Sequence, residues 1–279
     1  MRAAWLVVAA FTVACNSDAD GDGLDAAAEK ALGTDPALAD TDGDGIDDAK
    51  EADTNTDPLL ADTDKDGMSD GDEVLYGFDP LDEKSDGYKG GWPMQEVAVK
   101  DGVEADGKPG ADVKIGKRFP RWRFTDNFGD DVDLYDYAAQ GKKVIIDVSA
   151  QWCPPCNAMA DYMDGNDGVW GDDAFAASLK PLRDQVDAGD LLWVTVLPEQ
   201  NDSSPATVKT AKEWHKAYPT EPIAVLADTA GATGKGPMSA EDYVVRVTGG
   251  WPTFMLLNEN MTVVEMGVGV DFSTIMPKL

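Results

Sequence analysis

The chain has 279 residues and a formal net charge of −30, with 53 acidic residues against 23 lysines and arginines. This length accommodates one globular domain together with some smaller modules. The excess of negative charge argues against nucleic acid, or an anionic membrane surface, as an electrostatic partner.

Residues 1–14 predict an export signal. A short basic start is followed by an apolar run over 3–13, which is too short to span a bilayer. The run ends at Ala14-Cys15 and resembles a bacterial lipobox, which implies a lipoprotein with lipid on Cys15. Asn16 is not aspartate, which by the same resemblance favours the outer membrane. The alternative is ordinary signal cleavage near Ala14, and both interpretations predict an extracytoplasmic protein facing the periplasm or the cell surface.

Residues 15–86 contain three acidic copies with a period of 22 residues, and 24 acidic residues against four lysines fall within 16–86. Each copy has aspartates at loop positions one, three and five, glycine at six and glutamate at twelve, which is a calcium-loop pattern. The apolar residue at position seven offers its backbone carbonyl. The predicted metal ligands are Asp18, Asp20, Asp22, Leu24, Glu29, Asp40, Asp42, Asp44, Ile46, Glu51, Asp62, Asp64, Asp66, Met68 and Glu73.

These copies resemble the thrombospondin type-three calcium repeats of bacterial surface proteins. An Asp-Pro pair follows every loop in the same register, at Asp35, Asp57 and Asp79. The resemblance implies a stalk that calcium orders, because unligated carboxylates repel one another. The alternative is a solvated acidic spacer that binds nothing, and three copies in register favour calcium.

The rest of the chain predicts a glycine-rich linker over 87–112 and an α/β domain over 113–279. Within the linker, residues 97–99 are a candidate edge strand. Beyond it, strand-like and helix-like stretches alternate, which predicts an α/β sandwich. The expected strands are 122–124, 132–134, 143–149, 191–196, 223–227, 253–257 and 262–266, and the expected helices are 154–163 and 207–217.

The sequence Trp152-Cys153-Pro-Pro-Cys156 lies between a buried strand and a predicted helix. Cysteines at this spacing can form a disulfide at a helix N-terminus, where the dipole and free N–H groups favour a thiolate on the first sulfur. Zinc would need four ligands, and the chain has three cysteines and one histidine, His215, expected at the surface. A structural disulfide across two prolines would close almost no loop. With Cys15 assigned to lipid, the pair favours redox chemistry.

Residues 113–279 resemble the thioredoxin superfamily, and more narrowly the TlpA-like, membrane-tethered extracytoplasmic thioredoxins. The Trp-Cys-Pro-Pro-Cys motif and the Gly-x-x-Phe-Pro entry at 116–120 carry the resemblance. It implies a thioredoxin-like three-layer sandwich with a central mixed sheet. It also implies that Cys153 is the exposed attacking thiolate, that Cys156 is the buried resolving thiol and that Trp152 packs beside the disulfide.

Two further sites follow from the same resemblance. Residues 250–253 match the family's cis-proline loop, which implies that Pro252 is cis and lies opposite the cysteines, with Trp251 and Thr253 binding substrate. Asp147 takes the place of the family's buried acid, which implies that it accepts the proton of Cys156. Desolvation should raise its pKa. The alternative is an aspartate at a strand end that faces water.

The sequence therefore predicts a membrane-anchored thiol–disulfide oxidoreductase, with reduction favoured because tethered relatives are mostly reductases. The expected partners are disulfide-bearing or dithiol proteins and an electron-donor redox protein. Calcium in the stalk is the expected cofactor, and the redox domain should need none beyond the Cys153–Cys156 disulfide. The alternative is a calcium-dependent surface adhesion or scaffold protein whose thioredoxin fold is not catalytic. A peroxidase-like redoxin would need a Pro-x-x-x-Thr/Ser-x-x-Cys setting, which the sequence does not contain.

Overall fold

The computed structural model describes residues 18–83, 85, 87–100, 113–171, 173–220, 222–229 and 249–279. The chain divides into two compact units, 1–86 and 87–279, and each is described by itself. The predicted signal segment and the predicted lipidation site, Cys15, lie outside the described residues. Among the described residues, no helix is long and apolar enough to cross a membrane.

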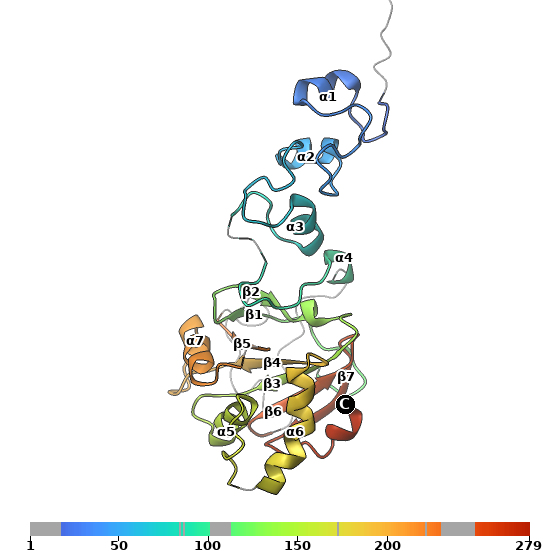
Figure 1. The fold of residues 1–279 in the computed structure, drawn as a ribbon. Coiled ribbons are helices and arrows are strands. Elements are labelled where there is room, and N and C mark those ends of the chain that lie inside the picture. The colour runs from blue at the N-terminus through green and yellow to red at the C-terminus, as the bar shows by residue number, and fades with distance from the viewer. Residues whose placement is uncertain are drawn as a thin grey trace, which may run out of the picture. The chain divides into compact units, whose positions relative to one another are not determined.

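The first unit consists of acidic loops, each followed by a two-turn helix (Figure 1). Each helix ends at a residue with positive φ, which is 95° at Gly33, 68° at Asn55 and 92° at Gly77. Helices of seven residues are marginal on their own, and Ile46 and Pro58 are the only buried apolar residues in the described part of this unit. Apolar packing therefore contributes little to its stability. The helices are α1 (Ala26–Leu32), α2 (Asp48–Thr54) and α3 (Asp70–Tyr76).

The second unit is built on a seven-stranded mixed sheet of order β2-β1-β5-β4-β3-β6-β7. Its centre is parallel, since β4 pairs parallel with both β3 and β5, while β6 pairs antiparallel with β3. These central strands are apolar on both faces, as strands covered on both sides must be. The strands are β1 (Arg123–Asp126), β2 (Asp131–Asp133), β3 (Lys143–Val148), β4 (Leu191–Leu197), β5 (Ile223–Ala227), β6 (Thr253–Leu257) and β7 (Val263–Val268).

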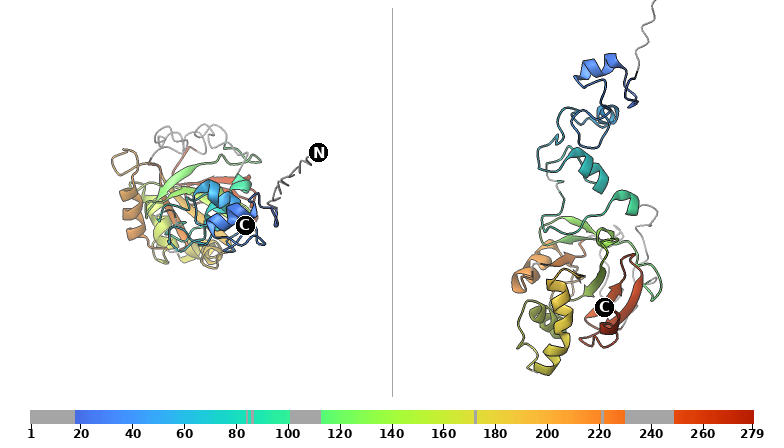
Figure 2. Two further views of the ribbon diagram at one scale, coloured as in Figure 1. Left: turned by 90° about the horizontal axis from the view of Figure 1, so that it is seen from above. Right: turned by 45° about the vertical axis from the view of Figure 1, so that its right-hand side comes forward.

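Three helices cover one face of this sheet (Figures 1 and 2). They are α5 (Pro154–Met163), α6 (Asp173–Asp187) and α7 (Val208–Ala217). Ile145 and Trp193 point to this helical face, whereas Ile146 and Val194 point to the other. There they pack with an aromatic cluster that includes Trp122 and Tyr135, the latter in the 3-10 helix η1 (Leu134–Tyr137). A second short 3-10 helix, η2, spans Met276–Lys278. The predicted α/β architecture with a central mixed sheet is confirmed.

The prediction of a linker at 87–112 is wrong for residues 87–100, which belong to the second unit. Trp92 is buried, and its indole N–H donates to Asp126 Oδ2 at 2.8 Å. Lys100 Nζ lies 2.6 Å from Asp136 Oδ1, and both side chains are buried. The expected edge strand at 97–99 is instead the short helix α4 (Val97–Lys100). Residues 101–112 lie outside the described part of the chain.

Candidate active site and metal loops

The two cysteines lie where β3 passes into α5. Cys153 is the N-cap residue of this ten-residue helix, with Pro154 at its first position. The backbone N–H of Cys156 donates to Cys153 Sγ at 3.2 Å, and a disulfide joins the two residues. A free helix N–H aimed at the first sulfur stabilises negative charge on it. The predicted placement at a helix N-terminus is therefore confirmed.

The expected exposure of Cys153 is wrong for the disulfide form. Cys153 is 2% exposed and Cys156 is 1% exposed, so the two sulfurs are equally covered. Both belong to an apolar cluster with residues of α7 and the end of β4, and Trp251 packs against this cluster. In the disulfide form, therefore, both cysteines are buried.

Two tryptophans flank the disulfide. The ring centroids of Trp152 and Trp251 lie 5.4 Å apart, with the rings inclined by 68°. Trp152 is 41% exposed, so the pair presents an aromatic surface to solvent. The peptide bond from Trp251 to Pro252 is cis, as predicted. Within the described part of the chain, the main-chain N–H and C=O of Trp251 have no hydrogen-bond partner.

Glu199 is a site residue that the sequence analysis missed. Its Oε1 accepts a hydrogen bond from Trp152 Nε1 at 2.7 Å, and the residue is nearly buried. Glu199 follows β4, and β4 runs parallel to β3, whose end leads to Trp152. Residues that follow neighbouring parallel strands meet at one sheet edge. That relationship is the signal that could have predicted the contact.

Thr253 differs from its expected role as a substrate-binding residue. It is the first residue of β6, it pairs with Val148 and it is fully buried. Its Oγ1 donates to the carbonyl of Gly250 at 2.8 Å. The side chain thus fixes the proline loop from within and is not available to a substrate.

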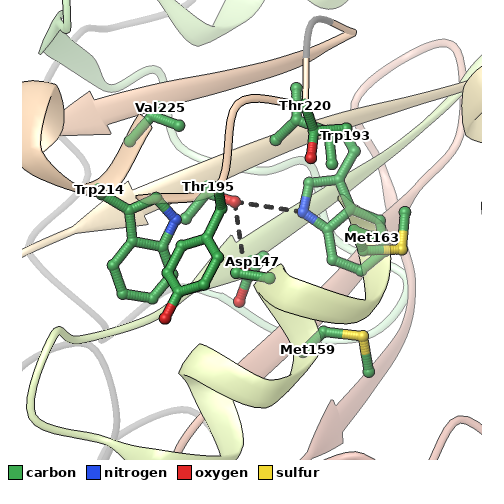
Figure 3. A pocket seen from close by; sticks show the side chains of 11 residues that line it. Asp147, Met159, Met163, Trp193, Thr195, Trp214, Thr220 and Val225 are labelled. Carbon is green, nitrogen blue, oxygen red and sulfur yellow. Dashed lines mark hydrogen bonds between the residues drawn. The ribbon is translucent and has the colours of Figure 1, made fainter. Parts of the chain in front are cut away.

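Asp147 is buried within the sheet, so the alternative of a water-facing aspartate is wrong. Its carboxylate accepts hydrogen bonds from Ser149 Oγ at 2.7 Å and from Thr195 Oγ1 at 3.1 Å. Thr195 in turn accepts one from Trp193 Nε1 at 3.3 Å (Figure 3). Burial raises the pKa of Asp147 to about 7, and these hydrogen bonds oppose the rise. Among the described residues its hydrogen bonds do not include Cys156.

A pocket opens beside Asp147, between the sheet and the helical layer. Met159 and Met163 come from α5 and Trp214 from α7, while Tyr218 follows α7 (Figure 3). Most of this lining is apolar, which explains why burial dominates the pKa of the carboxyl group. The lining of the pocket includes Asp147 and neither of the two cysteines.

The loops of the first unit gather carboxylates as predicted. The aspartates at positions one, three and five of each loop can bring one oxygen each within 4.8 Å of one another. The glutamates at position twelve are fully buried, and within the described residues neither oxygen of any of them has a hydrogen-bond partner. Burial, and then the charges of neighbouring aspartates, raise the pKa of Glu51 and of Glu73 to about 8. Converging, unpaired oxygens of this kind fit a hard cation such as calcium. The carbonyls of Leu24, Ile46 and Met68 stay predicted ligands.

The bacterial TSP3 repeat family matches residues 18–39, 40–61 and 62–83, so the first unit is an array of these calcium-binding repeats. This confirms the resemblance drawn from the sequence. No curated protein matches the chain.

Solved structures similar to the chain include thiol–disulfide proteins. A putative protein disulfide isomerase from Bacteroides thetaiotaomicron is 16% identical over 60% of this chain and 87% of its own, with a TM-score of 0.40. A putative thiol:disulfide interchange protein DsbE from Chlorobium tepidum is 20% identical over 60% and 94%, with a TM-score of 0.40. The exposed lipoprotein thioredoxin of Streptococcus pneumoniae is 19% identical over 57% and 96%, with a TM-score of 0.38. The mixed α/β fold is shown by the strand order and the disulfide site described above, and these similarities add nothing to that evidence.

Proposed function

We propose that this protein is an extracytoplasmic thiol–disulfide oxidoreductase that reduces protein disulfides and is held at the outer membrane by lipid on Cys15. The main support for this proposal is the Cys153–Cys156 disulfide at the N-terminus of α5, in which the backbone N–H of Cys156 donates to the Cys153 sulfur. That arrangement makes Cys153 the better thiolate, and a thiolate is the attacking species in disulfide exchange.

The reaction begins with the reduced protein. Cys153 Sγ attacks one sulfur of a substrate disulfide, forms a mixed disulfide and releases the other substrate sulfur as a thiolate. Cys156 then loses its proton and attacks Cys153 Sγ, which restores the Cys153–Cys156 disulfide and releases the second substrate sulfur. The substrate gains two electrons and the protein loses them; Cys156 gives up one proton, and water supplies the second proton that converts both substrate sulfurs to thiols. A dithiol partner protein reverses the change in the protein by the same two exchanges.

Asp147 is the proposed acceptor of the Cys156 proton. Its pKa of about 7 lets it take and return a proton near neutrality. The neighbouring pocket, lined by Asp147 and by residues of α5, is the proposed route of this proton to solvent. A bridging water would connect the carboxylate to the thiol.

The substrate is proposed to bind as an extended segment along the proline loop. The unpaired main-chain groups of Trp251 suit a short β-type pairing with such a segment. The exposed aromatic surface of Trp152 and Trp251 suits an apolar side chain next to the substrate cysteine. Both features favour an unfolded or flexible protein over a small thiol as substrate.

The remaining modules support this activity from outside the site. Residues 1–14 are proposed to be removed, and the repeats to hold the redox unit away from the membrane once calcium orders them. The redox domain is proposed to begin at residue 87 instead of 113, because 87–100 pack onto it.

The decisive test is the reduction of insulin by dithiothreitol, followed as precipitation of the free B chain. The wild-type chain should accelerate it, and Cys153→Ser should return it to the uncatalysed rate. Equal rates would favour the adhesion or scaffold alternative, in which calcium-dependent attachment would persist in Cys153→Ser. A reduction potential near the thioredoxin value of about −270 mV supports reduction, and one near about −120 mV would indicate oxidation.

A further inference from the structure

We propose that the first and the second calcium site of this array are each completed by an aspartate of the repeat that follows. The third site has no following repeat to complete it. The inference rests on the proposed calcium binding by the repeats and is independent of the redox chemistry. It assigns a ligand role to Asp48 and Asp70, which occupy loop position nine and lie outside the expected ligand set.

The bridging contact is clearest at the second loop. Asp44 and Glu51 belong to the second repeat, Asp70 belongs to the third, and each offers a carboxylate oxygen within 4.8 Å of the others. Asp70 and Glu51 are both fully buried. Both oxygens of Glu51 lack a hydrogen-bond partner among the described residues. Three converging carboxylates, one of them wholly unpaired and buried, need a cation between them.

The backbone joins the same two repeats. Gly71 N–H donates to Asp44 Oδ2 at 2.9 Å, across 27 residues. A Cβ at position 71 would lie 2.0 Å from the carbonyl oxygen of Asp44, so the two repeats approach more closely here than a side chain at position 71 would allow. Asp70 also fixes its own loop, since its two oxygens accept hydrogen bonds from Thr63 N–H and Thr63 Oγ1. One carboxylate therefore connects the second site to the third loop.

The first and second repeats are joined by the same kind of amide–carboxylate contact. Ala49 N–H donates to Asp22 Oδ2 at 3.2 Å, again across 27 residues. Asp48 is fully buried and accepts two hydrogen bonds from Thr41, as Asp70 does from Thr63. By the 22-residue register and by these hydrogen bonds, Asp48 corresponds to Asp70, and we assign it the same role at the first site.

The third loop has no such continuation. Twenty-two residues after Asp70 the chain has Trp92, which offers no carboxylate, and 22 residues after Gly71 it has Pro93, which has no N–H. Asp66, the third-loop counterpart of Asp22 and Asp44, keeps its Oδ2 unpaired within the described residues. The repeat register therefore supplies the third site with neither the carboxylate nor the amide that Asp70 and Gly71 give the second, and calcium affinity falls as charged ligands are lost.

The test is a calcium titration of the full chain, labelled with 15N-glycine, in which the loop glycines report the sites separately. Gly45 N–H donates to Asp40 in the second loop, and Gly67 N–H donates to Asp62 in the third. In the wild type, Gly45 should reach its midpoint at lower calcium than Gly67. Asp70→Asn keeps an acceptor and a donor for Thr63 but removes the charge, and it should raise the Gly45 midpoint about tenfold.

The matched control is Asp72→Asn, which removes the same charge from an exposed position two residues along α3 and should leave both midpoints within twofold. A second variant, Gly71→Ala, keeps every carboxylate but widens the close approach at position 71 toward the longer, 3.2 Å amide contact that Ala49 makes at the first junction, and it should also raise the Gly45 midpoint more than that of Gly67. A larger shift of Gly67 than of Gly45 in both variants would overturn the proposal. Equal wild-type midpoints would do the same, while leaving calcium binding itself intact. If no glycine resonance responds to calcium, the proposed calcium stalk fails as well, whereas the insulin assay reports the redox function separately.

Discussion

Trp152 Nε1 donates a hydrogen bond to Glu199 Oε1 at 2.7 Å, which ties the residue before the first cysteine to the end of the neighbouring strand β4. Glu199 itself is nearly buried, whereas Trp152 is 41% exposed. The buried carboxylate therefore fixes the orientation of the Trp152 indole, while part of the ring stays exposed to solvent.

Glu199→Ala should release this indole. The wild-type hydrogen bond to a charged acceptor is worth on the order of 2 kcal/mol, and part of that fixes the aromatic surface for substrate. We expect kcat/KM for insulin reduction to fall about threefold to tenfold, with the fold intact. Glu213→Ala, on the exposed side of α7, is the matched control and should leave the rate unchanged. An unchanged kcat/KM in Glu199→Ala would show that the orientation of Trp152 does not matter for activity.

The two cysteines should differ once the disulfide is reduced. Cys153 receives the helix N–H and should be alkylated near neutral pH well before Cys156, as measured by mass spectrometry of timed samples. Cys156→Ser should accumulate mixed disulfides with substrate, because resolution needs the second sulfur, and Cys153→Ser should form none. Faster labelling of Cys156 would reverse the assignment of their roles.

Trp251→Ala should uncover the disulfide. Trp251 packs against the cluster that contains both cysteines, each of which is 2% exposed or less. We expect dithiothreitol to reduce the disulfide several-fold faster in this variant, while kcat/KM for insulin falls because the aromatic surface is lost. Trp170→Ala, at a partly buried tryptophan that packs on a different cluster, controls for the loss of an indole. Slower reduction in Trp251→Ala would mean that the indole does not act as a cover.

The sequence predicts those parts of the fold that depend on short motifs. The cysteine pair follows a buried strand and opens a helix, and the loop before Thr253 contains a cis proline, because both geometries depend on neighbouring residues. The calcium loops are local in the same way. Contacts between distant segments are harder to predict. Trp92 and Asp126 are 34 residues apart with no shared motif, whereas Trp152 and Glu199, 47 residues apart, could be brought together only by first predicting that β3 and β4 pair in parallel.

Helix α6 shows a different limit of the sequence analysis. It contains Pro181, which usually ends a helix. Its buried residues Leu179, Leu182 and Val186 nevertheless keep the helical spacing of three and four, and they pack on the sheet. Tertiary packing outweighs the local preference of proline here. Tertiary contacts also outweigh the local sequence over residues 87–100. The glycines there predict a linker, but the buried ion pair between Lys100 and Asp136 holds this segment against the second unit.

Asp147→Asn should change both stability and rate. The native pKa of about 7 lies above the ordinary value of 3.8, so between these values the native state holds more protons than the unfolded state. Stability therefore falls as the pH rises from about 4 to about 7, and the full cost is present above that range. Removing the charge should stabilise the oxidised protein by a few kcal/mol at pH 8 and by little at pH 4, measured by urea unfolding. The control is Asp190→Asn, at an exposed position.

The same variant should slow the second exchange. Without the carboxylate, Cys156 loses its local base, so release of the reduced substrate should slow about tenfold or more near neutrality. The pH profile of that release should lose its step near pH 7. Retention of the step in Asp147→Asn would assign the proton to another group and leave Asp147 with a structural role.

Calcium removal should loosen the repeats and spare the redox site. The first unit has only two buried apolar residues among its described positions, Ile46 and Pro58, whereas the three glutamates at loop position twelve are buried without partners, so we expect a bound cation to be the main source of its stability. In the full chain, a chelator should therefore expose the repeats to proteolysis, while insulin reduction stays within about twofold. The pair Asp42→Ala and Glu51→Ala should remove about one bound ion, measured by calorimetry with calcium, at affinities of about 0.1–1 mM. If the repeats resist protease equally with and without calcium, they are a spacer that calcium does not order. If chelation stops insulin reduction, the two units are coupled and the proposed separation of stalk and redox domain is wrong.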